Sequence, residues 1–264
     1  MDRGIPIRAL TRGLSVLAAI NRDGPISMTG IARAAQVPYP TACRVMQTLI
    51  HEGFVEREPA RKRYRVTSLV HTLSTGFQAE DLLVRTARPH IEALCREVGW
   101  PISIATRVGT RMMVRDTTHK MTSLTFSHYY AGYTLPIAEC ATGKVNLAFC
   151  SDEERRSIID GWKAAESEAA NMGLLLLSED HLIRKIRADG YAMQIRNVYN
   201  ADPGKTSSIA VPLFDCEGGF VGSLALIYFA SAVKTDQAVE KFLALMQATA
   251  KAIAADLPVQ AAPR

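Results

Sequence analysis

The first 67 residues contain three short stretches with the apolar spacing of helices, followed by a stretch of alternating apolar and polar residues. The first stretch predicts a helix over residues 9–21. Three leucines form a stripe along one face of this helix: Leu10, Leu14 and Leu17. A second, short helix is predicted to begin after Ser27, because a serine hydroxyl can accept a hydrogen bond from a free N–H in the first turn.

A third helix is predicted to begin at Pro40 and to end at Gly53. The residue before a proline is disfavoured in the α conformation, so Tyr39 is expected to lie just outside the helix. Helical spacing places Ala42, Val45 and Leu49 on the inner face. The outward side chains are donors and acceptors that can reach base edges and phosphates in a DNA major groove: Tyr39, Thr41, Arg44 and Gln47.

Residues 54–67 alternate and are interrupted by Glu58-Pro59-Ala60-Arg61, which predicts a two-stranded hairpin. Three short helices followed by a hairpin indicate a winged helix-turn-helix domain over residues 1–67. The hairpin tip carries three positive side chains, here called the wing cations, which are placed to meet backbone phosphates: Arg61, Lys62 and Arg63. The alternative is a merely solvated amphipathic helix. The order of the elements and the localised charge both disfavour it.

Residues 68–98 have helical spacing throughout, and Pro89 marks a start or a kink within them. We predict a linker helix over residues 68–83. Its apolar stripe is suited to pack against a second copy of the chain: Leu69, Leu73 and Phe77. A second domain is expected over residues 84–258, followed by a flexible tail over 259–264.

The second domain alternates between the strand and helix patterns of an α+β fold. A hairpin is predicted to turn at residues 108–110, and a short helix to run from Thr142 to Phe149. Capping serines then predict two more helices, beginning at Ser151 and Ser178. Three strands and a final helix are expected over residues 191–197, 207–215, 220–229 and 235–256.

The chain has 264 residues, of which 48% are hydrophobic, so it can form a substantial core. Its formal net charge is +6 over residues 1–67 and −1 over the remainder, which is the pattern of a nucleic-acid-binding module joined to a neutral domain. The start of the chain lacks the apolar segment of a secretory signal, and its longest apolar run has 14 residues, too few to span a bilayer. Five scattered cysteines without a CxxC pair favour reduced thiols and a cytoplasmic location.

The sequence resembles the IclR family of bacterial transcriptional regulators across nearly its whole length. The resemblance rests on RALTRGLSVL and SMTGIARAAQVPYPTACRVMQTLIHEGFV near the start, followed by ATGKVNLAF, IRADGYA and SSIAVPLFDCEGGFVGSLAL in this order. It implies a winged helix joined through a linker helix to a GAF-like effector-binding domain. It also implies a homodimer or homotetramer on a palindromic double-stranded DNA operator, with RNA polymerase as a further candidate partner.

Four shorter segments, REVGWPISIATRVG, VRDTTH, LAFC and YFASAVKTDQAVEKFL, resemble the branch that regulates hydroxyphenylpropionate and related aromatic-acid catabolism. In that branch the regulator is an activator. The chain departs from many relatives at Pro40, where they carry a small hydroxyl residue; here Thr41 is the nearest hydroxyl. This departure leaves the cap and the base preference of the third helix open.

The resemblance places an effector site at a helix N-terminus, where free N–H groups and the helix dipole favour a carboxylate. The residues expected there are Ala141, Thr142 and Gly143, with Ser208 as a donor from a strand, and Tyr130, Tyr133, Leu224 and Leu226 as walls. The resemblance aligns Leu224 and Leu226 with serines of small-acid-sensing relatives, so an aromatic carboxylate is expected here. The alternatives are that Gly143 only permits helix packing, that Ser208 is a strand-edge residue, and that the tyrosines and leucines belong to the core.

No metal, cofactor or catalytic set is predicted. The histidines show no metal-ligand spacing: His51, His71, His90, His119, His128 and His181. The leading interpretation is a ligand-responsive DNA-binding regulator. Two alternatives stay open: a repressor that responds to a small non-aromatic acid, and an enzyme with an accessory DNA-binding module.

Overall fold

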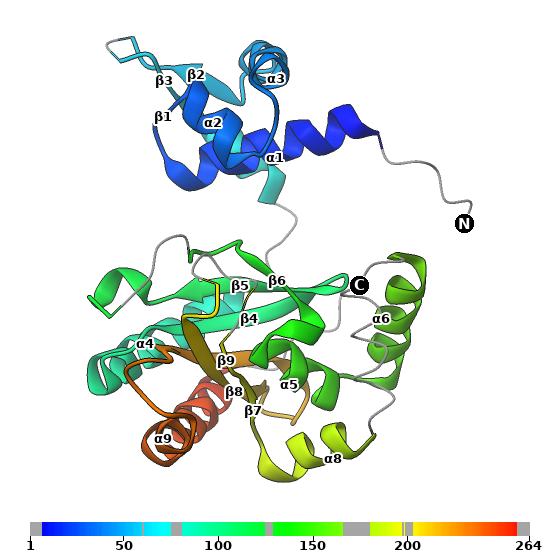
Figure 1. Ribbon diagram of the computed structural model, residues 1–264, viewed down its shortest axis with the longest axis vertical. Helices are drawn as coiled ribbons and strands as arrows, with labels where there is room; N and C mark the ends of the chain where they lie inside the picture. The colour runs from blue at the N-terminus through cyan, green and yellow to red at the C-terminus, as the bar shows by residue number, and fades with distance from the viewer. Residues whose placement is uncertain are drawn as a thin grey trace. The chain divides into compact units, whose positions relative to one another are not determined.

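The computed structural model describes residues 7–59, 61–74, 81–124, 129–165, 180–196, 198 and 203–257. The chain divides into two compact units, Met1–Gln78 and Ala79–Arg264, each with its own core (Figure 1). The predicted cap Ser178, the stripe residue Phe77 and the predicted tail 259–264 lie outside the described residues.

The first unit contains the predicted three helices and hairpin. They are α1 (Arg8–Asp23), α2 (Met28–Ala34), α3 (Tyr39–His51), β2 (Val55–Arg57) and β3 (Arg63–Val66). The predicted cap of α2 is confirmed, because the Ser27 hydroxyl accepts a hydrogen bond from the Gly30 N–H at 3.2 Å. One strand was missed: β1 (Ile26–Ser27) pairs antiparallel with β3, which gives a three-stranded sheet of order β1-β3-β2.

Two of the three leucines in the predicted stripe of α1 do not pack against the core. Leu10 and Leu14 are 59% and 58% exposed, whereas Val16, Ala19 and Ile20 are buried. The core of this small unit covers only the C-terminal half of α1, and none of residues 8–15 is buried. The leucine stripe therefore has a helical period, but only Leu17 of its three members packs against the core, where it is half-buried.

The three residues predicted for the inner face of α3 do face the core, but the prediction omitted Met46. Ala42 and Met46 are its buried residues, one helical turn apart, while Val45 and Leu49 flank them half-buried against the same core. The helix also begins earlier than expected. Its first backbone bond runs from the Ala42 N–H to the Pro38 carbonyl, so Tyr39 is the first helical residue and Pro38 the cap.

The predicted linker helix is a 3-10 helix in its described part, η1 (Ser68–Ser74). Side chains explain the tighter winding. The Thr72 and Ser74 hydroxyls bond back to the Leu69 and His71 carbonyls at 2.7 and 3.0 Å, and such bonds compete with α-helical donors. The helix α4 (Asp81–Val98) then runs continuously through Pro89.

The second unit is built on a six-stranded antiparallel sheet of order β6-β5-β4-β9-β8-β7. The strands are β4 (Ile102–Val108), β5 (Arg111–Thr117), β6 (Thr134–Pro136), β7 (Ala192–Gln194), β8 (Thr206–Phe214) and β9 (Phe220–Phe229). The other elements are α5 (Ala141–Phe149), α6 (Asp152–Ala165), α8 (Asp180–Asp189) and α9 (Thr235–Asp256), with 3-10 helices η2 (His119–Met121) and η3 (Ile137–Glu139). The α+β class and the effector-domain architecture are confirmed; β6 was not predicted.

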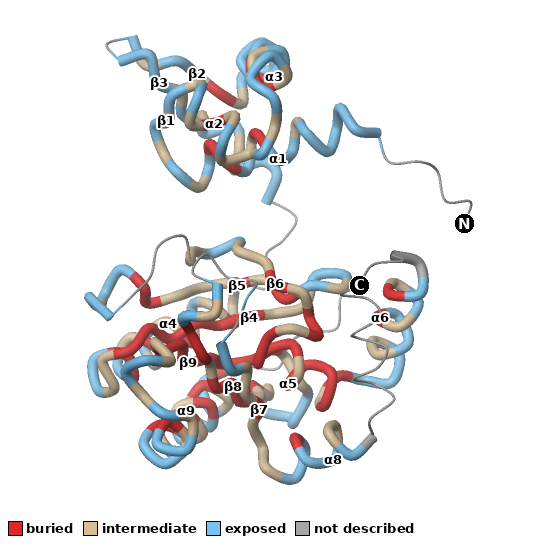
Figure 2. The backbone as a smooth tube through the Cα atoms, viewed as in Figure 1, coloured by how far each residue is buried: buried red, intermediate tan, exposed pale blue. Residues whose placement is uncertain are grey.

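Helices cover both faces of this sheet, and the buried residues concentrate between them (Figures 1 and 2). One face packs against α4 and α9, and the other against α5 and α8. Successive residues of a strand point to opposite faces. Along β9, Leu224, Leu226 and Tyr228 belong to the α4–α9 core, while Ala225 belongs to the α5 side. This alternation decides which residues can reach the site described next.

Candidate functional site

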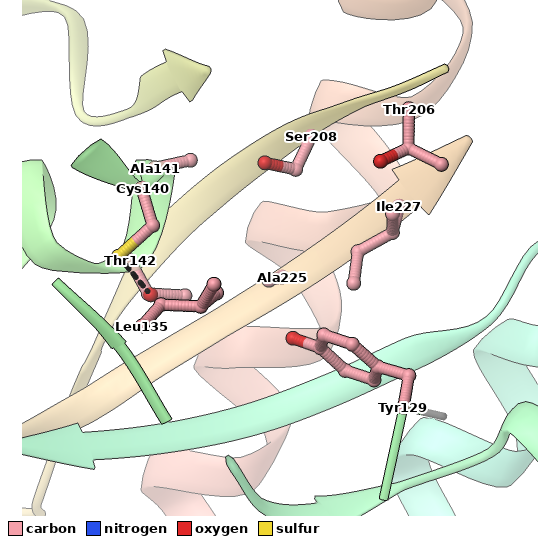
Figure 3. Close-up of a pocket in the computed structure, with 9 residues that line it drawn as sticks. All are labelled: Tyr129, Leu135, Cys140, Ala141, Thr142, Thr206, Ser208, Ala225 and Ile227. Atoms are coloured by element: carbon pink, nitrogen blue, oxygen red, sulfur yellow. Dashed lines mark hydrogen bonds between the residues drawn. The ribbon is translucent and has the colours of Figure 1, made fainter. Parts of the chain in front are cut away.

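A small cavity lies between the N-terminal end of α5 and strands β8 and β9 (Figure 3). Three of its lining residues come from the start of α5: Cys140, Ala141 and Thr142. The strands contribute Thr206, Ser208, Ala225 and Ile227, and the segment before η3 contributes Tyr129 and Leu135. None of these side chains is charged at neutral pH, so the helix end is the electrostatic feature of the cavity.

The start of α5 leaves its first N–H groups without a capping side chain. Cys140 stands at the cap position in an extended conformation, and its side chain makes no cap hydrogen bond. Its thiol instead lies 3.4 Å from the Thr142 hydroxyl, and burial raises the pKa of the Cys140 thiol. A helix end with free N–H groups attracts negative charge, so this end of the cavity suits a carboxylate.

Gly143 does not line the cavity. A Cβ atom at this position would lie 1.8 Å from the Ile137 carbonyl oxygen and 2.6 Å from its carbon, so only glycine lets α5 pack on η3. This agrees with the alternative interpretation of Gly143, in which the glycine permits helix packing. Its role is to fix where the helix end lies.

The strand wall differs from the prediction by one residue. Ser208 lines the cavity as expected, but Leu224 and Leu226 are fully buried in the core on the opposite face of the sheet. Their neighbours Ala225 and Ile227 take the cavity positions, because a shift of one residue changes the face of a strand. The expected wall of Leu224 and Leu226 is wrong, although the residues that replace it are also apolar.

Of the tyrosines near residue 130, Tyr129 lines the cavity, while the predicted Tyr130 and Tyr133 do not. Tyr133 lies between the other two rings, 5.5 Å from Tyr129 and 5.6 Å from Tyr130. Figure 3 shows the Tyr129 ring with its hydroxyl directed into the cavity. Burial raises the pKa of Tyr129, so its phenol is neutral at physiological pH.

Tyr129 is held from behind by His119. The two rings stack with centroids 4.5 Å apart and planes 27° apart. The His119 Nδ1 atom lies 2.6 Å from the Thr117 hydroxyl, and burial lowers the pKa of His119 to about 4. The imidazole is therefore neutral at physiological pH and acts as a flat apolar support for the phenol ring.

The cavity has a volume of about 20 Å³. A cavity needs roughly 10–15 Å³ by this measure to hold one water molecule, so there is room for about one water and not for an aromatic ring. Any organic ligand at the α5 end must displace a side chain, and Tyr129 is the largest one that lines the cavity.

The sequence missed six lining residues: Tyr129, Leu135, Cys140, Thr206, Ala225 and Ile227. Thr206 could have been predicted from the sequence, because it lies two residues before Ser208 and therefore on the same face of the strand. Cys140 directly precedes the predicted helix end. For Ala225 and Ile227, no local signal distinguishes the two faces of a strand that is apolar on both.

The first unit presents the predicted DNA-facing side chains on its surface. Tyr39 is 50% exposed, Arg44 and Gln47 are exposed, and Thr41 is half-buried. The wing cations are also exposed, and within the described residues none of them forms an ion pair. By contrast, the nearby Arg65 is neutralised by Glu56 at 2.6 Å. Uncompensated charge is therefore concentrated at the wing tip.

Two negative findings concern the described residues alone. They hold no group of three or more His, Cys, Asp or Glu side chains arranged for a metal ion. They also contain no helix that is long and apolar enough to cross a membrane.

Comparison with protein families gives two matches that together cover most of the chain. Residues 79–255 match the family described as bacterial transcriptional regulator IclR C-terminal. Residues 9–59 match the IclR helix-turn-helix domain. The division between the matches agrees with the two units of the fold.

Similar proteins are transcriptional regulators. The chain is 25% identical over 263 residues to the DNA-binding transcriptional repressor YiaJ of Escherichia coli, covering 97% of this chain and 90% of YiaJ. It is 22% identical over 156 residues to the regulator TsaQ1/TsaQ2 of Comamonas testosteroni, covering 59% of this chain and 56% of that protein. Among solved structures, an IclR homologue from Microbacterium hydrocarbonoxydans, complexed with 4-hydroxybenzoate, has a TM-score of 0.64 at 20% identity over 94% of this chain and 98% of that one.

Proposed function

The chain belongs to the IclR family of bacterial transcriptional regulators and is a ligand-responsive DNA-binding regulator, and from this premise we propose that its effector is a monoaromatic carboxylic acid. The genes under its control would then serve aromatic-acid catabolism. A structurally similar family member is complexed with 4-hydroxybenzoate, so this fold can accommodate such a ligand.

The observation that carries the proposal is the position of the Tyr129 ring. It fills the space next to the α5 end with a neutral phenol, stacked on His119 and hydrogen-bonded to Ser103. If Tyr129 moves out, the space that it leaves has the shape and the polar partner of a hydroxyphenyl ring. A ligand ring can then stack on His119 in its place.

The carboxylate of such a ligand would lie at the α5 end. The free N–H groups of the first turn and the Thr142 hydroxyl are donors there, and Ser208 faces them from β8. No lining side chain supplies positive charge, so the helix end bears the electrostatic role. The apolar side chains of Ala225 and Ile227 would contact the ring.

Calorimetry on the full-length chain tests this assignment. We expect binding of 4-hydroxybenzoate or 3-(4-hydroxyphenyl)propionate, and no comparable binding of glyoxylate or pyruvate. Tight binding of the small acids without a response to the aromatic ones would contradict the proposal.

One observation favours a second candidate, a repressor that senses a small non-aromatic acid. The cavity of about 20 Å³ is closer to the needs of a two- or three-carbon acid than to those of an aromatic ring. The same titration separates the two candidates, because they predict opposite orders of affinity.

For the DNA side, we propose that α3 enters the major groove, with Arg44 and Gln47 at base edges and Tyr39 and Thr41 nearby. The wing cations would lie on backbone phosphates. A gel shift with DNA from upstream of the chain's own gene tests this assignment. If no upstream fragment is bound in preference to unrelated DNA, this assignment fails.

We further propose that the chain binds as a homodimer. The exposed apolar side chains of the first unit, Leu10, Leu14 and Leu73, would pack against a second copy. Two recognition helices fixed in this way match two half-sites of a palindrome. Sedimentation of the full-length chain measures the oligomeric state directly.

A further inference from the structure

A second cavity, of about 200 Å³, lies in the second unit and shares no lining residue with the effector cavity. Its polar wall is formed by Arg107 at the end of β4, Asn146 of α5 and Glu154 of α6. Its apolar wall is formed by Leu83 of α4 and by Phe220 and Val221 of β9. By the measure applied to the first cavity, roughly 10–15 Å³ for one water, this space is large enough for a small organic molecule.

Two residues that line this cavity each carry a polar atom with no partner within the described residues. Arg107 Nε and Asn146 Oδ1 are both buried without a hydrogen bond, and Asn146 is only 3% exposed. Buried polar groups are paired in the great majority of cases, so two unpaired ones at a single cavity indicate a missing partner. One atom is a donor and the other an acceptor, so the partner must offer both functions.

The charged side chains of the wall restrict further which molecules can bind. Arg107 Nη2 donates to Glu154 Oε1 at 3.2 Å, so the wall carries one positive and one negative group side by side. A simple carboxylate would be repelled by the negative charge of Glu154, and a simple amine would be repelled by the positive charge of Arg107. A molecule with an ammonium and a carboxylate group attached to the same carbon atom satisfies both side chains.

We propose that this cavity binds an apolar α-amino acid. Its carboxylate accepts from Arg107, its ammonium group donates to Asn146 Oδ1 and Glu154, and its side chain packs against Phe220, Val221 and Leu83. This site goes beyond the effector proposal and does not depend on it.

Leu83 places the site beside the start of α4. Leu83 lies in the first turn of α4, close after the boundary between the two units. A Cβ atom on Gly222 would lie 3.6 Å from Leu83 and 3.0 Å from the Ala105 carbonyl, so this corner is tightly packed. A ligand side chain placed beside Leu83 therefore contacts the first turn of α4, the helix that follows the linker.

The test is calorimetry and thermal shift on the full-length chain with L-leucine, L-valine and L-phenylalanine. Matched analogues of leucine separate the two charges: 4-methylpentanoate lacks the ammonium group, and isoamylamine lacks the carboxylate. We expect at least one amino acid to bind, and the two leucine analogues to bind about tenfold or more weakly than leucine. No binding of any of the three amino acids at millimolar concentration, or equal binding of an analogue, would overturn the proposal.

Variants locate the binding. Arg107→Gln and Asn146→Leu should each weaken amino-acid binding about tenfold or more, while Arg156→Gln, a charge loss on the same helix as Glu154 but outside the cavity, should leave it unchanged. Unchanged binding in a folded Arg107→Gln variant overturns the site. If Asn146→Leu fails to fold, the Arg107 variant and the analogue series on the wild-type chain still decide the outcome.

Discussion

Replacing Gly143 with alanine tests whether the position of the α5 end governs effector binding. The added Cβ would lie 1.8 Å from the Ile137 carbonyl oxygen, whereas real Cβ atoms essentially never come within 3.0 Å. The two segments must therefore separate by about 1.2 Å. Both are backbone, so rotation of a side chain cannot relieve the clash.

The magnitude follows from two opposed effects. Overpacking a close-packed site typically costs about 1–3 kcal/mol, and a clash between backbone segments belongs at the upper end or above it. Alanine recovers about 1 kcal/mol of helix propensity relative to glycine. The net loss of stability is then about 2 kcal/mol or more, equivalent to a fall in Tm of roughly 4–8 °C for a domain of this size.

The assay combines thermal unfolding with calorimetric titration of the effector. Gly161→Ala is the matched control: it adds a methyl group to a helix of the same unit, and its nearest contact is the terminal methyl of Thr110, which can rotate away. We expect Gly143→Ala to lower both Tm and effector affinity, and the control to lower neither appreciably. A Gly143→Ala protein with wild-type Tm and affinity would refute the packing argument.

Four further predictions concern the two sites. Arg44→Ala should cost about 1–3 kcal/mol of specific operator binding, measured by gel shift against Arg156→Ala as a control; unchanged affinity would remove Arg44 from the interface. Neutralising the wing cations should weaken binding to all DNA sequences and reduce the salt slope by up to about 0.9 per lost phosphate contact; an unchanged slope would place the wing off the backbone. Burial holds the pKa of His119 at about 4, below its ordinary value, so stability should fall as pH drops from about 6.5 to 4, by up to about 3 kcal/mol. Comparing wild type with His119→Asn in urea at each pH isolates this loss, and parallel curves would contradict it. Tyr129→Ala should raise the affinity for aromatic acids, because no ring has to be displaced. The control variant Tyr130→Ala should leave that affinity without such a rise. A loss of affinity in Tyr129→Ala would mean that the phenol binds the ligand instead of blocking it.

The sequence predicted the first unit well because its signals are local. The hydroxyl of Ser27, a proline near the start of α3 and a glycine after it mark helix ends through local hydrogen bonding and backbone conformation. The inner face of α1 could not be predicted in this way. Two apolar stripes run along the helix, and only the position of the other helices decides that Val16 is buried and Leu14 is not.

The candidate site shows the same limit more sharply. The helix end at Ala141 and Thr142 was found because a family motif marks it, and Ser208 because its strand resembles the pocket wall of the family. On β9, both faces are apolar, so the sequence contains no signal that separates Leu224 from Ala225. The face is decided by hydrogen-bonded register with β4 and β8, which is a property of the assembled sheet.

A chain of contacts connects the small cavity to α4. Tyr129 stacks on His119, His119 is bonded to Thr117, and Arg88 of α4 donates to the Thr117 carbonyl and to Asp116 at 3.4 and 2.7 Å. Displacing the Tyr129 ring therefore removes the stacking partner of His119. His119 is connected to α4 through Thr117 at the end of β5. A ligand can shift such an equilibrium only by its differential affinity for the two arrangements. Reciprocity then requires operator DNA to change effector affinity by the same factor by which effector changes operator affinity. Equal effector affinities with and without DNA would mean that control takes another route, such as contact with RNA polymerase.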